Sequence, residues 1–229
     1  MLSKTKIDQL GDQLRRGAAS QVDLRLLDEY RRSFEPAIDI VTRQIIQLTT
    51  DQPTARPAKS TLSITEKLKR EKVRLSQMQD IAGCRVVVRG ALAQELFQKA
   101  SPRSFPFCEI MDRRLKPSHG YRAVHILANV DGKTVEIQVR TQLQHLWAQM
   151  SEAYADRFGS EIKYGGGSPE IRRLLLDCSD RIQKLEESEL KPADMEYSQE
   201  NQHVTEFDAQ WDALRSALQN MLHDVAGSS

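Results

Sequence analysis

The residues best placed to do chemistry lie between positions 116 and 141. Here the apolar residues Val135, Ile137 and Val139 alternate with the polar residues Glu136, Gln138 and Arg140. This period of two predicts a strand with one apolar and one polar face, and the polar face could form one surface of a binding site. Tyr121 and His125, just upstream, would supply an aromatic wall. A carboxylate for a metal, a cation for phosphate and a ring for a base together suit a nucleotide.

Two carboxylates are candidate metal ligands. Asp80 stands at the entry to a predicted buried strand, in the run Gln79-Asp80-Ile81-Ala82-Gly83, and Glu136 stands in mid-strand. A carboxylate in a strand is costly unless it is paired or exposed. Brought together, the two side chains could hold Mg²⁺ and its bound phosphates. The alternative stays open that Asp80 caps a turn and Glu136 faces water.

Basic and hydroxyl side chains gather where a loop enters the predicted helix that starts at Ser60 or Thr61. Lys59, Ser63 and Lys67 recur at four-residue steps and so share one helical face, with Arg56 shortly before them. Cations and a hydroxyl at a helix start suit a triphosphate. The alternative is a solvated basic face. The sequence has neither the GxxxxGK[ST] nor the GxGxxG pattern, so a triphosphate would be held without those loops.

Composition indicates a globular protein without a membrane span. The chain has 229 residues, of which 39% are hydrophobic and 28% charged, with three scattered cysteines. We therefore expect a cytoplasmic protein with reduced thiols and no zinc site. The net charge of +1 is unevenly spread, because residues 51–89 carry nine basic and four acidic side chains, whereas residues 168–229 carry six basic and thirteen acidic ones. The basic segment favours a polyanionic ligand.

The order of predicted elements indicates an α+β fold with a small mixed or antiparallel sheet flanked by helices. The Asp131-Gly132 pair predicts a hairpin turn, and Thr141 predicts a helix cap. Helices are predicted over residues 5–19, 22–48 (interrupted at Pro36), 60–76, 91–100, 142–157, 169–189 and 204–225, and strands over 84–89, 107–113, 121–130 and 133–140. The predicted division is an N-terminal helical extension (1–50), a core (51–165) and an acidic helical C-terminal part (166–229).

Four motifs together resemble the synthetase domain of the RelA/SpoT alarmone family. They are Lys59-x-x-x-Ser63-x-x-x-Lys67, Asp80-Ile-Ala-Gly-Cys-Arg85, Gly120-Tyr-Arg-Ala-Val-His125 and Val135-Glu-Ile-Gln-Val-Arg-Thr141. The resemblance covers residues 55–160 and implies a nucleotidyltransferase-like sheet. It also implies a small stand-alone synthetase that moves the β,γ-pyrophosphate of ATP to the ribose 3′-hydroxyl of GDP or GTP.

The resemblance assigns roles to particular residues. Asp80 and Glu136 would hold Mg²⁺ and act as the catalytic pair, with Glu136 taking the proton of the 3′-hydroxyl. The ATP-binding residues would be Arg56, Lys59, Ser63, Lys67 and Arg85. The acceptor-binding residues would be Lys116, His119, Tyr121, His125, Gln138 and Arg140.

The acceptor loop departs from the family pattern, which leaves the acceptor open. Guanosine-nucleotide synthetases place a lysine four residues before the stacking tyrosine and an asparagine two before it, where this chain has Pro117 and His119. Arg56 also lies one residue further from Ser63 than usual. Related toxins modify the 3′-terminal adenosine of tRNA and are neutralised by a partner protein. A tRNA acceptor, an adenosine acceptor and a degenerate nucleotide-sensing or interaction module therefore remain alternatives, as do a homo-oligomer and an antitoxin partner.

Overall fold

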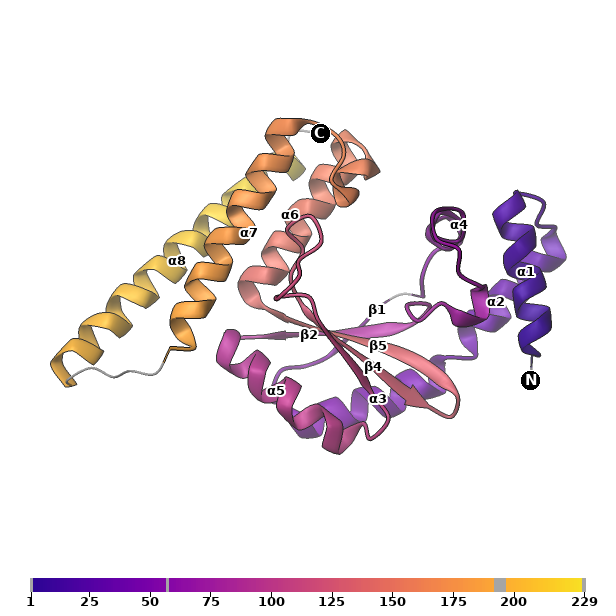
Figure 1. Cartoon of the computed structure of the whole chain (residues 1–229), viewed down its shortest axis with the longest axis horizontal. Helices are drawn as coiled ribbons and strands as arrows, with labels where there is room; N and C mark the ends of the chain where they lie inside the picture. Colours follow the sequence, from indigo (N-terminus) through magenta and orange to yellow (C-terminus); the bar gives the residue numbers. More distant parts are fainter. Residues whose placement is uncertain (1, 57, 192–196, 228–229) are drawn as a thin grey trace. The chain divides into compact units, whose positions relative to one another are not determined.

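The computed structural model describes residues 2–56, 58–191 and 197–227, and it has an α+β fold (Figure 1). A five-stranded sheet has the order β1-β2-β5-β4-β3. Its strands are β1 (Thr54–Arg56), β2 (Gly83–Val88), β3 (Glu109–Asp112), β4 (Val124–Val130) and β5 (Lys133–Thr141). The helices are α1 (Lys4–Arg16), α2 (Gln21–Arg32), α3 (Glu35–Leu48), α4 (Thr61–Arg70), α5 (Ala91–Ser104), α6 (Gln142–Phe158), α7 (Pro169–Glu189) and α8 (Tyr197–Gly227), with short 3-10 turns η1 (Leu75–Gln77) and η2 (Ser160–Tyr164).

Local chemistry explains most of the boundaries. Ser20 caps α2 in a reciprocal capping box with Asp23, and Thr141 does the same for α6 with Gln144. Asp131 and Gly132 both have positive φ, at 50° and 74°, which is the backbone of a type I′ hairpin turn. The hairpin and the cap predicted from the sequence are therefore confirmed.

The interruption predicted for the helix over 22–48 is confirmed, because this segment forms two helices and Pro36 lies in the first turn of α3, where a missing N–H costs nothing. Three other details of the prediction are wrong. The helix that Ser60 caps ends at Arg70 and does not reach residue 76. Strand β1 lies in the segment predicted as a loop. The strand predicted to begin at Tyr121 begins at Val124.

Two compact units can be described, and several strands contribute to both. The first unit comprises residues 1–86, 100–110 and 126–138, and the second comprises residues 87–99, 111–125 and 139–229. The three-part division predicted from the sequence stays a prediction. Residues 192–196 and 228–229 of its C-terminal part lie outside the described residues. No helix in the described ranges is long and apolar enough to cross a membrane.

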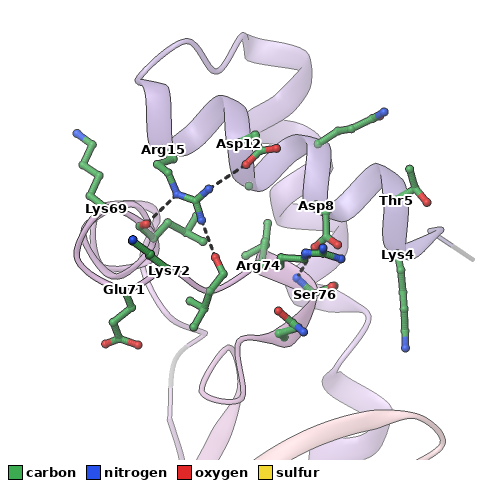
Figure 2. Close-up of a pocket in the computed structure, with 16 residues that line it drawn as sticks. Lys4, Thr5, Asp8, Asp12, Arg15, Lys69, Glu71, Lys72, Arg74 and Ser76 are labelled. Carbon is green, nitrogen blue, oxygen red and sulfur yellow. Dashed lines mark hydrogen bonds and ion pairs between the residues drawn. The ribbon is translucent and has the colours of Figure 1, made fainter.

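In the first unit, α1 packs on α4 and η1 around an apolar cluster. Arg15 of α1 donates from Nε to the Leu68 carbonyl at 2.8 Å and from Nη2 to the Val73 carbonyl at 2.6 Å (Figure 2). These bonds satisfy carbonyls at and beyond the end of α4 that the helix itself cannot satisfy. A groove of about 890 Å³ lies between α1 and residues 68–77. None of the predicted site residues lines this groove.

In the second unit, α6, α7 and α8 pack against one another (Figure 1). Their shared core includes Leu143, Trp147 and Met150 of α6, Leu175 and Ile182 of α7, and Leu218 of α8. Trp147 is buried and donates from Nε1 to the Leu175 carbonyl at 2.7 Å. It is therefore a packing residue of the second unit.

Candidate active site

Asp80 is held by two lysines of the first unit. Lys59 Nζ lies 3.0 Å from Asp80 Oδ2, and Lys67 Nζ lies 3.0 Å from Asp80 Oδ1. Burial raises the pKa of the Asp80 carboxyl, but the two ammonium groups outweigh it, so the pKa lies below its usual value. The four-residue spacing of the basic motif thus places its first and last members on one carboxylate. Asp80 is ionised and has a cation on each oxygen.

Glu136 is the second carboxylate, and it is buried on β5 with only 6% of its surface exposed. Its Oε2 accepts from Arg56 Nη1 at 2.8 Å and from Gln138 Nε2 at 2.8 Å. The alternative that Glu136 faces water is therefore wrong. The cost of a buried carboxylate is offset by a charge-assisted hydrogen bond from Arg56.

A close backbone contact joins the segment after Asp80 to Glu136. The Glu136 N–H donates to the Ala82 carbonyl at 3.1 Å. A Cβ added to Gly83 would lie 2.3 Å from the Glu136 carbonyl oxygen, so only glycine fits there. A glycine inside a strand marks such an approach, and this signal was present in the sequence. The main chain therefore holds the segment that follows Asp80 against Glu136.

The remaining predicted ATP-binding residues lie in the same unit. Ser63 is in the first turn of α4, where its N–H donates to Ser60 Oγ at 3.1 Å and its own Oγ accepts from that hydroxyl at 2.9 Å. Arg85 is half-buried on β2, opposite Thr54 of β1. Cys84 beside it is fully buried, and burial raises the pKa of its thiol to about 12, so it is not a nucleophile.

In the second unit, Tyr121 lies at the centre of a polar aromatic cluster. Its hydroxyl lies 2.8 Å from His125 Nε2 and accepts from Arg140 Nη2 at 3.1 Å. The Arg140 guanidinium carbon is 5.1 Å from the centre of the Tyr121 ring. The structure therefore brings together three of the predicted acceptor-binding residues. Gln138, a fourth, hydrogen-bonds to Glu136 in the first unit.

The loop before Tyr121 is exposed and tightly shaped. Lys116 and His119 are exposed, and His119 has a φ of 52° in the left-handed region that asparagine, aspartate and histidine tolerate better than most residues. Gly120 follows with a φ of 89°, and a Cβ there would lie 2.8 Å from the Trp147 ring. The loop therefore needs glycine before Tyr121, and His119 fills the position where the resemblance expects asparagine.

The donor set limits what metal could bind. The described residues contain no group of three or more His, Cys, Asp and Glu side chains that could hold an ion. Asp80 and Glu136 offer carboxylate oxygens, which suit Mg²⁺ bound mainly by phosphates and water. Each carboxylate is neutralised by protein cations, which a metal–triphosphate ligand could replace. The two residues thus fit a metal that arrives with its nucleotide.

Comparison with known proteins identifies the central part of the chain. Residues 56–157 match the family model described as the region found in RelA/SpoT proteins. This match spans less than half of the chain. The matched segment, called the RelA/SpoT-like region below, contains both carboxylates, the Tyr121 cluster and every other predicted site residue.

Proteins similar to this chain include one uncharacterised and one named protein. The uncharacterized protein Rv1366 of Mycobacterium tuberculosis is 38% identical over 111 residues, covering 47% of this chain and 41% of the relative. This chain thus spans less than half of that relative's length. GTP pyrophosphokinase YjbM of Bacillus subtilis is 28% identical over 179 residues, covering 72% of this chain and 75% of the relative.

Solved structures show the same fold. Small alarmone synthetase 1 from Bacillus subtilis, bound to its product pppGpp, aligns with a TM-score of 0.56 and 22% identity over 69% of this chain and 93% of that one. The same enzyme bound to AMPCPP aligns with a TM-score of 0.53 and 20% identity, over 71% of this chain and 93% of that one. The predicted α+β class is thereby confirmed.

Proposed function

We propose that this chain is an ATP-dependent pyrophosphotransferase that moves the β,γ-pyrophosphate of ATP to the ribose 3′-hydroxyl of GDP or GTP. The observation that carries the proposal is the pair Asp80 and Glu136, joined through the main chain at Ala82 and neutralised by Lys59, Lys67 and Arg56. Phosphoryl-type transfer needs positioning and charge neutralisation more than a covalent nucleophile. The similarity to GTP pyrophosphokinase YjbM supports the same reaction.

The ATP side of this proposal rests on the first unit. Lys59 and Lys67 would exchange their contact with Asp80 for ATP phosphates, and Arg56 would turn from Glu136 in the same way. Ser63 and Arg85 would add a hydroxyl and a further cation. Asp80 and Glu136 would hold Mg²⁺, which supplies positive charge to the phosphate oxygens when bound.

The transfer itself breaks one bond and forms one. The acceptor 3′-oxygen attacks the β-phosphorus, the bond from that phosphorus to the bridging oxygen of the α-phosphate breaks, and AMP leaves. The hydroxyl proton passes to the Glu136 carboxylate. Release of the bond from Arg56 would free Glu136 Oε2 to take this proton.

The acceptor side rests on the second unit. The Tyr121 ring would stack on the acceptor base, with His125 and Arg140 fixing its hydroxyl. Lys116 and His119 lie on the exposed loop, where they would meet the acceptor phosphates or base edge.

The exposure of that loop also favours a second candidate, pyrophosphorylation of the 3′-terminal adenosine of tRNA. Leu115 is 81% exposed, and the neighbouring Lys116 is also exposed. A polyanionic acceptor larger than a nucleotide would cover such a surface. In this case a neutralising partner protein would be needed in the cell.

One experiment separates these functions. Purified protein is incubated with Mg²⁺ and ATP labelled at the γ-phosphate, with GDP, GTP, ATP or deacylated tRNA in parallel, and with Asp80→Asn as the inactive control. Label on GDP or GTP supports the proposal, and label on tRNA alone supports the toxin. If no acceptor is labelled although ATP binds, the chain is a nucleotide-sensing or interaction module.

A further inference from the structure

Helix α7 carries two buried polar side chains on one face. Ser179 is 1% exposed and Glu186 is 8% exposed, and they lie seven residues apart, about two helical turns. Between them, Ile182 is buried in the apolar core of the second unit. Polar groups in such a place are kept only where they satisfy partners. Their partners flank Tyr121 and Arg140.

Ser179 hydrogen-bonds to both sequence neighbours of Tyr121, through the main chain of Gly120 and the side chain of Arg122. Its Oγ donates to the Gly120 carbonyl at 2.7 Å and accepts from Arg122 Nε at 2.9 Å. Arg122 is itself buried and donates from Nη1 to the Arg114 carbonyl at 2.7 Å. The Ser179 hydroxyl therefore both donates and accepts a hydrogen bond, and its two partners are the residues before and after Tyr121.

Glu186 holds the corner that follows Arg140. Its two oxygens face Thr141 Oγ1 and Gln144 Nε2, the latter at 2.8 Å. Thr141 is the cap of α6, and its Oγ1 already accepts the N–H of Gln144 at 3.1 Å. The Glu186 carboxyl thus contacts both members of the capping box at the start of α6. Arg140, which bonds to Tyr121, immediately precedes this capping box.

The side-chain amide of Gln94 fixes which groups donate and which accept in these hydrogen bonds. Gln94 of α5 donates from Nε2 to the Val139 carbonyl at 2.8 Å and to Gln144 Oε1 at 2.8 Å. Because the Val139 carbonyl can only accept, the Gln94 amide has one orientation, and so does Gln144. Gln144 therefore presents its NH₂ to position 186, and that position must supply an acceptor.

Two chemical groups satisfy this requirement at position 186. A carboxylate accepts from both Gln144 and Thr141. A neutral acid or a glutamine accepts from Gln144 and donates to the second lone pair of Thr141 Oγ1. An aliphatic side chain satisfies neither and leaves buried donors unmatched. Substitution of Glu186 by glutamine should therefore preserve these hydrogen bonds, whereas substitution by leucine should break them.

We propose that Ser179 and Glu186 are positioning residues for acceptor recognition, acting through Gly120, Arg122 and Thr141 on the Tyr121–Arg140 pair. The proposal rests on the assignment of Tyr121 and Arg140 to the acceptor under the proposed function. It makes α7, which follows the RelA/SpoT-like region in sequence, a functional part of the acceptor site.

The test compares Glu186→Leu and Ser179→Ala with the conservative Glu186→Gln in the full chain. With labelled ATP and the best acceptor, we expect Glu186→Leu and Ser179→Ala to raise the acceptor KM about tenfold or more, and the ATP KM to stay within about twofold. Glu186→Gln should keep both constants near those of the parent. Leu185→Ala, which removes buried apolar contact from the same helix, serves as a control for destabilisation alone.

A second readout does not depend on activity. The ¹⁵N signals of the His125 ring report its hydrogen bond to Tyr121, so Glu186→Leu and Ser179→Ala should shift them, whereas Glu186→Gln and Leu185→Ala should not. If the parent transfers no label, the proposed function fails, and these signals still decide the positioning role. Unshifted signals in both Glu186→Leu and Ser179→Ala overturn the inference. It is equally overturned if Leu185→Ala raises the acceptor KM as much as they do.

Discussion

Arg56 Nη1 and Glu136 Oε2 lie 2.8 Å apart, so a cation assigned to ATP is the counter-ion of the carboxylate assigned to the 3′-hydroxyl. The Glu136 side chain is 8% exposed and that of Arg56 is 35% exposed. Arg56 can therefore leave towards solvent or a phosphate, whereas Glu136 cannot follow. Binding of a triphosphate that draws Arg56 away would leave Glu136 ready to accept a proton.

Glu136→Gln keeps the shape of the side chain and removes its charge and basicity. We expect the rate of pyrophosphate transfer at saturating substrates to fall by about a hundredfold or more, as for loss of a general base. Glu109→Gln, on an exposed residue of β3, is the matched control and should keep the parental rate. A Glu136→Gln variant as fast as the parent would remove Glu136 from the mechanism.

Gly83→Ala tests the backbone contact that joins the two carboxylate segments. The added methyl would lie 2.3 Å from the Glu136 carbonyl oxygen, so β2 and β5 must separate. We expect the free energy of unfolding to fall by at least about 2 kcal/mol. Gly132→Ala is the control, since no atom lies within 4 Å of the added carbon and only the φ of 74° is strained, at a cost of about 1 kcal/mol. Equal losses in the two variants would refute the close contact.

Arg15→Ala tests how α1 is joined to the end of α4. The guanidinium donates to the carbonyls of Leu68 and Val73, and its loss leaves both without that donor (Figure 2). We expect a destabilisation of about 2–3 kcal/mol in urea unfolding. The neighbouring Arg16 is exposed, so Arg16→Ala should change stability by less than about 0.5 kcal/mol. An equally small effect of Arg15→Ala would show that the hydrogen bonds from Arg15 to the Leu68 and Val73 carbonyls do not stabilise the fold.

Glu186 predicts a pH dependence of stability. Burial raises the pKa of its carboxyl from 4.5 to about 7, with Glu189 adding to the rise, while hydrogen bonds from Thr141 and Gln144 and the charge of Arg114 oppose it. The folded state therefore holds the proton more tightly than the unfolded state. Its contribution to stability is complete below the unfolded pKa and is lost as pH rises through the folded pKa, on the order of 3 kcal/mol in all.

The measurement is the difference in unfolding free energy between the parent and Glu186→Gln at about pH 5 and pH 8. Because glutamine does not titrate, the parent should lose stability relative to the variant as pH rises. A difference that stays constant across this range would show that Glu186 has an ordinary pKa.

The sequence predicted the elements whose cause is local. The hairpin followed from Asp131-Gly132, and α6 followed from the cap at Thr141. Strand β1 was missed because three residues are too few to show alternation. Helix α4 was extended too far because Lys and Glu favour a helix up to residue 72. The N–H group that satisfies the Leu68 carbonyl near its end comes from Arg15 in α1, which the local sequence does not show.

The same limit applies to the site. Motif spacing selected Lys59, Lys67 and Asp80 as charged residues of one site, but only the fold shows that both lysines contact that carboxylate. Ser179 and Glu186 were not predicted, because a polar residue within an apolar helical stripe gives no sign of its partner. Their partners lie 59 and 45 residues away in the sequence, at Gly120 and Thr141.

The bond from Ser179 to the Gly120 carbonyl also bears on how the protein is made. A ribosome completes the loop at Gly120 and the cap at Thr141 well before it adds α7. Until Ser179 and Glu186 emerge, the nascent chain holds every residue of the RelA/SpoT motifs, yet the acceptor corner lacks its supports. Under the proposed positioning role, the acceptor corner of a nascent chain gains both supports only after α7 has been synthesised.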